Sequence, residues 1–176
     1  MSSPTAQRLL EAGREELRAV GAQALTIRMV AQRAGVSSAT AYTYLESKNR
    51  LYAELFWRFL VEDDRGPQGA DALARVRSVT RHLGERLAGA PELAAAVTPA
   101  LLGADPEVDE LRIRIGGELV RRFRVALGDA ADADLLETLT LAFSGALLQA
   151  GMGLMTYAEM ADRLDAVVAT IMRGNS

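Results

Sequence analysis

Hydrophobic side chains recur every three or four positions along almost the whole chain. This spacing, close to the 3.6 residues of a helical turn, predicts amphipathic α-helices and no β-sheet. Serine or threonine stands before the first four apolar runs, where its side chain would cap a helix, and glycine or proline follows most runs. The predicted helices cover about residues 4–20, 27–34, 38–45, 47–60, 73–87, 92–102, 108–123, 132–154 and 158–173.

Composition describes a folded chain whose charge is unevenly distributed. The 176 residues are 49% hydrophobic and include no cysteine, which excludes a disordered chain, disulfides and thiol catalysis. A net charge of −3 at first argues against nucleic acid as a partner. However, residues 1–60 carry a net charge of +3 and residues 61–176 carry −6, and turn-forming residues 65–69 lie near the change of sign.

Residues 138–158 contain no charged side chain and are long enough to cross a bilayer. Their polar side chains, three glycines and acidic flanks favour instead a helix buried in a bundle, so no membrane association is expected. Small side chains recur along this stretch at helical spacing and would let a second copy pack closely. We therefore predict a homodimer whose interface includes Leu139, Ala142, Ala146, Ala150, Gly153, Leu164, Val168 and Ile171.

Residues 26–45 have the pattern of two short helices joined by a glycine turn. Gly35 supplies the backbone conformation that other residues avoid, and small or aliphatic residues stand where the helices would cross. This is the helix-turn-helix layout, whose second helix enters the major groove of DNA. A generic helical hairpin is the alternative, which the Gly-Val-Ser turn makes less favoured.

Many positions in the first third of the chain fit one known motif without a gap. They are Leu9, Leu10, Glu11, Ala12, Gly21, Thr26, Ile27, Arg28, Val30, Ala31, Ala34, Gly35, Val36, Ser37, Thr40, Tyr42, Tyr44, Leu45, Ser47, Lys48 and Leu51. In these residues the chain resembles the DNA-binding domain of the TetR family of transcriptional repressors. The other two thirds fit that family only in the number and order of helices. The departures from the family pattern include Glu16, where the family often has an apolar residue, and Ala41, which replaces a larger aliphatic one.

The resemblance implies an all-α fold with an N-terminal three-helix helix-turn-helix domain followed by a helical domain for ligand binding and dimerisation. We accordingly expect a DNA-binding domain over residues 1–46, a linking helix over 47–62 and the ligand-binding domain over 63–176. The implied protein is a cytoplasmic transcriptional regulator, a repressor by family analogy. It would bind a palindromic double-stranded operator as a homodimer and be released by an unidentified small hydrophobic ligand. No cofactor and no metal are expected.

Ten residues are predicted to face DNA: Thr26, Arg28, Ser37, Ser38, Ala39, Thr40, Tyr42, Thr43, Tyr44 and Lys48. Thr26 and Ser37 begin helices, whose free N–H groups suit phosphate. The resemblance places Lys48 on the phosphate backbone, although a solvated surface charge is the alternative. Residues 38–45 lack the side chains that make bidentate base contacts, so specificity per half-site would be modest. Arg28 could read guanine, or equally clamp a phosphate or form a surface ion pair.

A ligand pocket between helices would be lined by Trp57, Phe59, His82, Leu101, Leu102, Ile113, Phe143, Met152 and Met155. Each of these residues is also a candidate for ordinary core, and a lone histidine is more often structural than catalytic. Because no nucleophile–base pair is evident in residues 61–176, we do not expect an enzyme. A helical enzyme acting on a hydrophobic substrate and a membrane-associated protein are the competing interpretations.

Overall fold

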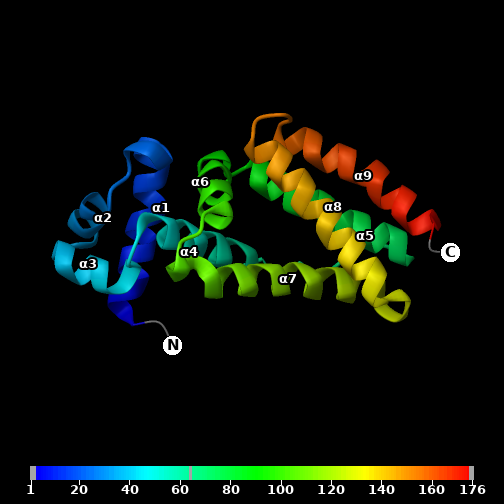
Figure 1. The fold of residues 1–176 in the computed structure, drawn as a ribbon, viewed down its shortest axis with the longest axis horizontal. Coiled ribbons are helices and arrows are strands. Elements are labelled where there is room, and N and C mark those ends of the chain that lie inside the picture. Colours follow the sequence, from blue (N-terminus) through cyan, green and yellow to red (C-terminus); the bar gives the residue numbers. More distant parts are fainter. Residues whose placement is uncertain (1–2, 64, 175–176) are drawn as a thin grey trace. The chain divides into compact units, whose positions relative to one another are not determined.

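The computed structural model describes residues 3–63 and 65–174, and these form helices joined by turns and loops, without a strand (Figure 1). The α-helices are α1 (Pro4–Ala24), α2 (Ile27–Ala34), α3 (Ser38–Leu45), α4 (Lys48–Val61), α5 (Ala72–Ala88), α6 (Pro91–Leu102), α7 (Asp109–Leu127), α8 (Ala133–Gly151) and α9 (Tyr157–Gly174). Two 3-10 turns, η1 (Pro106–Val108) and η2 (Gly128–Ala130), stand on either side of α7. The predicted all-α class is confirmed.

The helices group into two compact units. The first consists of Met1–Glu62 and Pro91–Arg114, and the second of Asp63–Ala90 and Ile115–Ser176. Helix α6 belongs to the first unit because Ala96 and Ala100 are buried in the same core as the N-terminal helices. The predicted functional division at residues 46 and 62 stays a prediction, since it concerns roles rather than packing.

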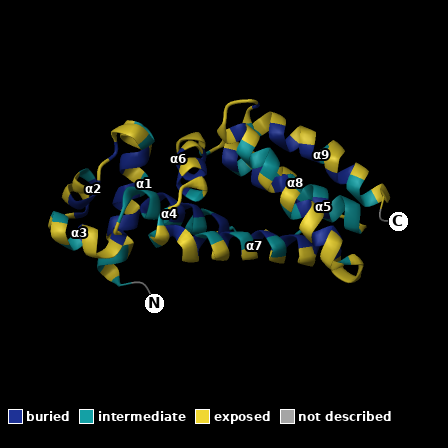
Figure 2. Cartoon of the chain, viewed as in Figure 1, coloured by how far each residue is buried: buried dark blue, intermediate teal, exposed yellow. Residues whose placement is uncertain are grey.

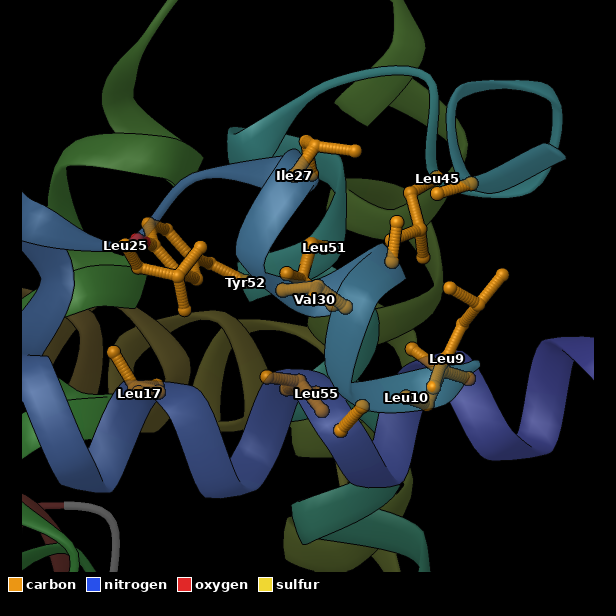
Figure 3. Close-up of a cluster of buried hydrophobic side chains, with 14 of the residues drawn as sticks. Leu9, Leu10, Leu17, Leu25, Ile27, Val30, Leu45, Leu51, Tyr52 and Leu55 are labelled. Atoms are coloured by element: carbon orange, nitrogen blue, oxygen red, sulfur yellow. The ribbon is translucent and has the colours of Figure 1, made fainter. Parts of the chain in front are cut away.

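The core of the first unit brings together leucines and valines from all four N-terminal helices (Figure 3). Leu9 of α1, Val30 of α2 and Leu51 of α4 have no exposed surface. A side chain at Gly13 would lie 2.8 Å from Leu51 Cδ1, so the glycine allows α1 to approach α4 closely. This core holds α3 in a fixed position against α2 and α4, which matters for any surface that α3 presents.

The second unit is built on α9, which packs against both α5 and α8. At the crossing of α5 and α9, a Cβ atom on Gly84 would lie 2.8 Å from Cβ of Ala161, so the two backbones are in close contact. Phe123 of α7 and Phe143 of α8 meet edge to face, with ring centroids 6.1 Å apart. The preference of aromatic rings for this geometry adds to the burial of both side chains.

Helix ends fall close to where the sequence predicts them. Side-chain oxygens of Thr26, Ser37 and Ser47 each accept a hydrogen bond from the backbone N–H three residues later, as N-caps do. The N-terminal helix passes its predicted end at Gly21 and reaches Ala24. Gly21 itself has φ 75°, so the regular helix is nevertheless interrupted at the predicted residue.

The uncharged stretch 138–158 is not one helix, so the predicted helix over residues 132–154 is too long. Helix α8 ends at Gly151, and Gly153 adopts φ 76° in the turn that follows. The next helix begins with a capping box in which Thr156 and Glu159 exchange side-chain to backbone hydrogen bonds of 3.1 and 2.7 Å. Among the described residues, none of the helices combines the length and the hydropathy that a membrane span requires.

Candidate nucleic-acid interface

Helices α2 and α3 form the predicted helix-turn-helix. Gly35 has φ 66° and ψ 36°, and its N–H donates to the carbonyl oxygens of Ala31 and Gln32. Val36 N–H also donates to the Ala31 carbonyl, at 3.0 Å, which completes the end of α2. Ser37 then caps α3 at once. The left-handed glycine and the immediate cap set the angle at which α3 leaves the turn.

The outward side of α3 is open to solvent. Of its eight residues only Ala41 and Leu45 are buried, and both face the core, whereas the other six are exposed or half-exposed (Figure 2). Tyr42 is 53% exposed and Tyr44 is 42% exposed, so neither is a core aromatic. A helix with one buried edge and polar side chains on the rest suits insertion into a groove.

Several hydroxyl groups predicted to read DNA already have local partners. Thr43 Oγ1 donates to the Ala39 carbonyl at 3.0 Å, and Ser37 Oγ lies 2.8 Å from Thr40 Oγ1. The hydroxyl oxygens of Thr40 and Thr43 can still accept a further hydrogen bond, whereas Ser37 Oγ already accepts one from the Thr40 N–H. Ser38 is half-exposed and Ala39 is exposed. The hydroxyls are therefore oriented by the helix itself, which limits them to weak contacts with bases.

Arg28 is the cation most available at this surface. It is exposed on the first turn of α2, next to the exposed N-cap Thr26, and among the described residues no carboxylate pairs with it. This removes the ion-pair alternative within the described chain. Reading a guanine and clamping a phosphate both stay open for its guanidinium.

Lys48 is neither a free surface charge nor fully available. Its Nζ donates to the carbonyl oxygens of Ala22 at 3.0 Å and Gln23 at 3.3 Å, at the end of α1. Tyr52 OH donates to the same Ala22 carbonyl at 2.7 Å, and burial raises the pKa of Tyr52 to about 12. An ammonium has three donors, so one N–H of Lys48 is left for a phosphate. Sequence reasoning missed this anchoring role because the partners are 25 and 26 residues away.

Glu16, the departure from the family pattern, is explained by Arg33. The Glu16 side chain is only 10% exposed and accepts from Arg33 Nε at 2.6 Å, while Glu15 accepts from Arg33 Nη1 at 3.1 Å. These bonds, to Glu16 first and then to Glu15, raise the pKa of Arg33 above its ordinary value. These ion pairs neutralise Arg33, which is one of the basic side chains that give residues 1–60 their charge of +3.

The nine predicted ligand residues divide between the two units. In the first unit, Trp57 lies under the guanidinium of Arg114, 4.4 Å from the ring centroid, and Phe59 stacks on Phe56. Leu101 is half-exposed there, whereas Leu102 and Ile113 are 65% and 76% exposed.

In the second unit, Phe143 and Met155 are buried, whereas Met152 is 63% exposed. The His82 ring forms a hydrogen bond with the carboxylate of Asp63. Phe143 therefore serves the core. A pocket common to the nine residues stays a prediction.

The predicted dimer residues occupy both the inside and the outside of the second unit. Leu139, Leu164 and Val168 are at most 2% exposed, so their side chains pack within one chain. Ala150 is also buried, whereas Ala142, Ala146 and Ile171 are half-exposed and Gly153 is exposed. The predicted interface did not include Leu141, Met152 and Leu154, which are 63–65% exposed along and just after α8. Such exposed apolar side chains are the usual signal of an interface.

Known relatives support the assignment of this surface. Residues 9–55 match the bacterial regulatory proteins of the tetR family. Uncharacterized HTH-type transcriptional regulators of Mycobacterium bovis and Mycobacterium tuberculosis are each 45% identical over 177 aligned positions, which cover 97% of this chain and 81% of theirs.

Solved structures share the fold at lower identity. A TetR transcriptional regulator from Rhodococcus sp. RHA1 superposes with a TM-score of 0.79 at 19% identity, covering 94% of this chain and 96% of that one. Thermus thermophilus FadR, a TetR-family repressor solved in complex with lauroyl-CoA, has a TM-score of 0.68 at 21% identity and covers 93% of both chains. With the mycobacterial relatives matched along nearly its whole length, the chain belongs to the tetR family of bacterial transcriptional regulators.

Proposed function

We propose that the chain is a repressor that binds a palindromic operator as a homodimer and is released by a small hydrophobic ligand. The observation that carries the proposal is the open face of α3, bearing exposed Tyr42 and Tyr44. Beside it stands exposed Arg28 at the start of α2, which pairs with no carboxylate of the described residues. A rigid core behind this face and family membership support the same conclusion.

Phosphate contacts would position the protein and base contacts would specify the site. The first turns of α2 and α3, the two tyrosine hydroxyls and the remaining N–H of Lys48 suit phosphates. Arg28 and the methyl groups of Ala39 and Thr43 suit base edges. Because few of these contacts are bidentate, one half-site would bind weakly, and two helices about 34–36 Å apart in a dimer would be needed for selectivity.

The dimer interface would lie on α8 and α9, centred on exposed apolar residues rather than on the buried ones of the sequence prediction. Leu141, half-exposed Leu148 and Met152 follow one another at helical spacing along one side of α8. Half-exposed Ala142 and Ala146 stand beside them and would allow close approach of a second copy. A two-fold axis would then place each of these residues against the same surface of the partner.

Coupling between ligand and DNA would pass through the start of α4. Asn49 Nδ2 donates to Asp105 Oδ2, and Arg50 Nη1 donates to the Glu107 carbonyl at 2.8 Å, so the turn between α6 and α7 is tied to the first turn of α4. Arg112 of α7 donates to the carbonyl of Asp105 in that turn, at 3.3 Å, and to the carbonyl of Leu101 in the last turn of α6, at 2.8 Å. A ligand that moves this turn would tilt α4 and the recognition helix joined to it, provided that it binds the displaced state more tightly.

The ligand class to test first is a long aliphatic chain, since Thermus thermophilus FadR, which has this fold, holds lauroyl-CoA. The half-buried and exposed apolar residues of the first unit, Trp57, Leu101, Leu102 and Ile113, are mostly aliphatic and suit such a ligand.

The experiment is a fluorescence-anisotropy titration of labelled DNA from upstream of the gene, with a shuffled duplex of equal composition as control. We expect tighter binding to the natural duplex and a steep loss of affinity with salt. Lauroyl-CoA is then added to the complex, and release is the expected result. Equal affinity for both duplexes at low salt would overturn the operator proposal, and unchanged anisotropy would exclude lauroyl-CoA as the releasing ligand.

A further inference from the structure

A hollow of about 240 Å³ opens on the second unit, between the loop before α5 and the exposed side of α5. This volume is roughly that of eight water molecules, enough for a phosphate or for a carboxylate with a short tail. The side chains that matter in its lining are Arg65, Gln68, Ser78, Arg81, His82 and Glu85. The hollow lies entirely within one unit.

His82 is held in one orientation on the wall of the hollow. Its Nε2 lies 2.8 Å from Asp63 Oδ2, and the same oxygen is 3.2 Å from Arg122 Nη1 and 3.4 Å from Arg86 Nη1. Because an ionised carboxylate only accepts hydrogen bonds, we assign the proton of this pair to Nε2. The two arginines keep the carboxylate in place, and the other ring nitrogen, Nδ1, is left for a second partner.

The group facing Nδ1 is the guanidinium of Arg65. Its Nη1 lies 3.5 Å from His82 Nδ1, a long contact, and no carboxylate in the described part of the chain pairs with this guanidinium. The backbone N–H of Arg65 donates to Asp63 Oδ1 at 3.2 Å, so the carboxylate that holds the imidazole also holds the loop that carries the arginine.

The other polar side chains of the lining either have hydrogen-bond or ion-pair partners within the protein or carry a negative charge. Ser78 Oγ accepts from Gln68 N–H at 2.7 Å and donates to the Arg75 carbonyl at 2.8 Å. Arg81 forms an ion pair with Asp165 at 3.0 Å. Glu85 is exposed and is the one carboxylate among the lining residues. Its negative charge disfavours a second negative charge nearby.

We propose that this hollow binds the oxyanion group of a small ligand, a carboxylate or a phosphate, between the Arg65 guanidinium and the His82 ring. An oxyanion can accept two parallel hydrogen bonds from a guanidinium, which is the pairing that arginine makes best. One of these oxygens would also accept a hydrogen bond from His82 Nδ1. Because Nε2 already carries the proton of the neutral ring, Nδ1 would take up a proton from solvent when the anion binds, and the negative charge of the anion would offset the two cations it joins. The site does not depend on the DNA-binding role, because it is formed by the second unit alone.

The test uses the full-length chain without DNA and follows the imidazole signals of His82, the single histidine, by NMR. Sodium phosphate and sodium acetate are titrated separately, at fixed pH and at ionic strength held constant with sodium chloride. We expect a saturable shift with at least one of the two, and the tighter anion identifies the chemical group of the ligand. In Arg65→Gln the affinity should fall about tenfold or more, as expected for loss of charge-assisted hydrogen bonds.

Two further variants make the result decisive. Glu85→Gln removes the opposing charge and should bind the anion more tightly. Arg163→Gln deletes a charge from an exposed position on α9 that does not line the hollow, and it should bind as the unmodified protein does. The proposal is overturned if neither anion gives a saturable shift, or if Arg65→Gln and Arg163→Gln weaken binding equally, since the effect would then be a diffuse one of net charge.

Discussion

The Nζ atom of Lys48, the first residue of α4, lies 3.0 Å from the carbonyl oxygen of Ala22 near the end of α1. A cation at this place satisfies carbonyl groups that the helix leaves unpaired and interacts favourably with the helix dipole. The same residue stands at the surface proposed to meet DNA. One side chain would therefore both join α1 to α4 and contact a phosphate.

Replacing Lys48 with alanine should weaken binding to every DNA sequence alike. The loss of a phosphate contact should reduce the slope of log affinity against log salt by about 1. The loss of the Ala22 bond should lower the free energy of unfolding by about 1 kcal/mol. Binding is measured by anisotropy over a salt series, and stability by urea denaturation.

Tyr52→Phe is the matched control, because it removes the other hydrogen bond to the Ala22 carbonyl and leaves the charge unchanged. It should lower stability without altering the salt slope. If Tyr52→Phe weakens DNA binding as much as Lys48→Ala does, Lys48 acts only by positioning α1.

Arg28→Ala distinguishes base reading from phosphate contact. If the guanidinium reads a guanine, the variant should lose about 1–3 kcal/mol of preference at one base position and little elsewhere. The measurement is a binding titration over a set of operators with single base changes. Arg18, an exposed arginine on α1, provides the control Arg18→Ala. A uniform loss over all operators would assign Arg28 to the phosphate backbone.

The sequence predicted the helix ends, which depend on local periodicity and capping. It did not predict the hydrogen bonds and ion pairs between residues far apart in the chain. Thr26, Ser37, Ser47 and Gly35 act within four residues of their own position, and their roles as helix caps and turn glycine were predicted correctly. The partners of Glu16 and Lys48 lie 17 and 26 residues away, and Asp63 meets Arg122 across 59 residues. No pattern of nearby residues reveals such pairs, because they depend on how the helices pack.

The same reasoning explains the overestimated length of α8 and the choice of buried residues for the predicted interface, which stays a prediction. Apolar periodicity placed Leu139 on the apolar face of α8, and Leu164 and Val168 on the apolar face of α9. Periodicity alone does not distinguish a face that is buried inside the protomer from one that a partner covers. The predicted helix over residues 132–154 was too long because glycines in an uncharged run do not by themselves show where a helix ends. The end is determined by the positive φ of Gly153, which the sequence does not reveal.

Leu141→Glu should dissociate the proposed dimer. The leucine is 65% exposed in one chain, so the substitution costs the isolated protomer little, whereas two glutamates close to the two-fold axis would repel each other and remain desolvated. Sedimentation equilibrium at micromolar concentration measures the mass. Val125→Glu, at a residue 50% exposed on α7, is the control and should leave the mass unchanged. An unmodified chain that sediments as a monomer would contradict the homodimer itself.

Protonation of Asp63 at low pH should lower the stability of the second unit. Burial alone would raise the pKa of this carboxyl, but its bonds to His82 and to the Arg65 N–H outweigh burial and leave the pKa below its ordinary value of 3.8. A carboxyl with a lowered folded-state pKa stabilises the fold above its unfolded pKa and loses that contribution as the pH falls through the folded value. We therefore expect the free energy of unfolding to decline as the pH drops below about 4.

Asp63→Asn checks the source of that decline. At pH 7 it should cost about 3 kcal/mol, because His82 and Arg122 lose the charge that pairs with them in a site where the Asp63 side chain is only 9% exposed. The difference from the unmodified protein, measured by urea denaturation with far-UV circular dichroism, should narrow towards pH 3.5. A difference that stays constant with pH would mean that the charge of Asp63 is not what stabilises the unit.

Gly84→Ala and Gly117→Ala should have opposite effects although the chemical change is the same. At Gly84 the added methyl group would lie 2.8 Å from Cβ and 3.3 Å from Cα of Ala161, and no flexible side chain end is there to give way. Helices α5 and α9 would have to separate, which costs about 1–3 kcal/mol of stability. At Gly117, inside α7, no atom outside the backbone of its own helix turns lies within 4 Å of the added carbon, so only helix propensity changes and stability should rise by about 0.5–1 kcal/mol. Thermal denaturation of both variants measures the two shifts, and a Gly84→Ala protein as stable as the unmodified one would show that α5 and α9 are not in backbone contact.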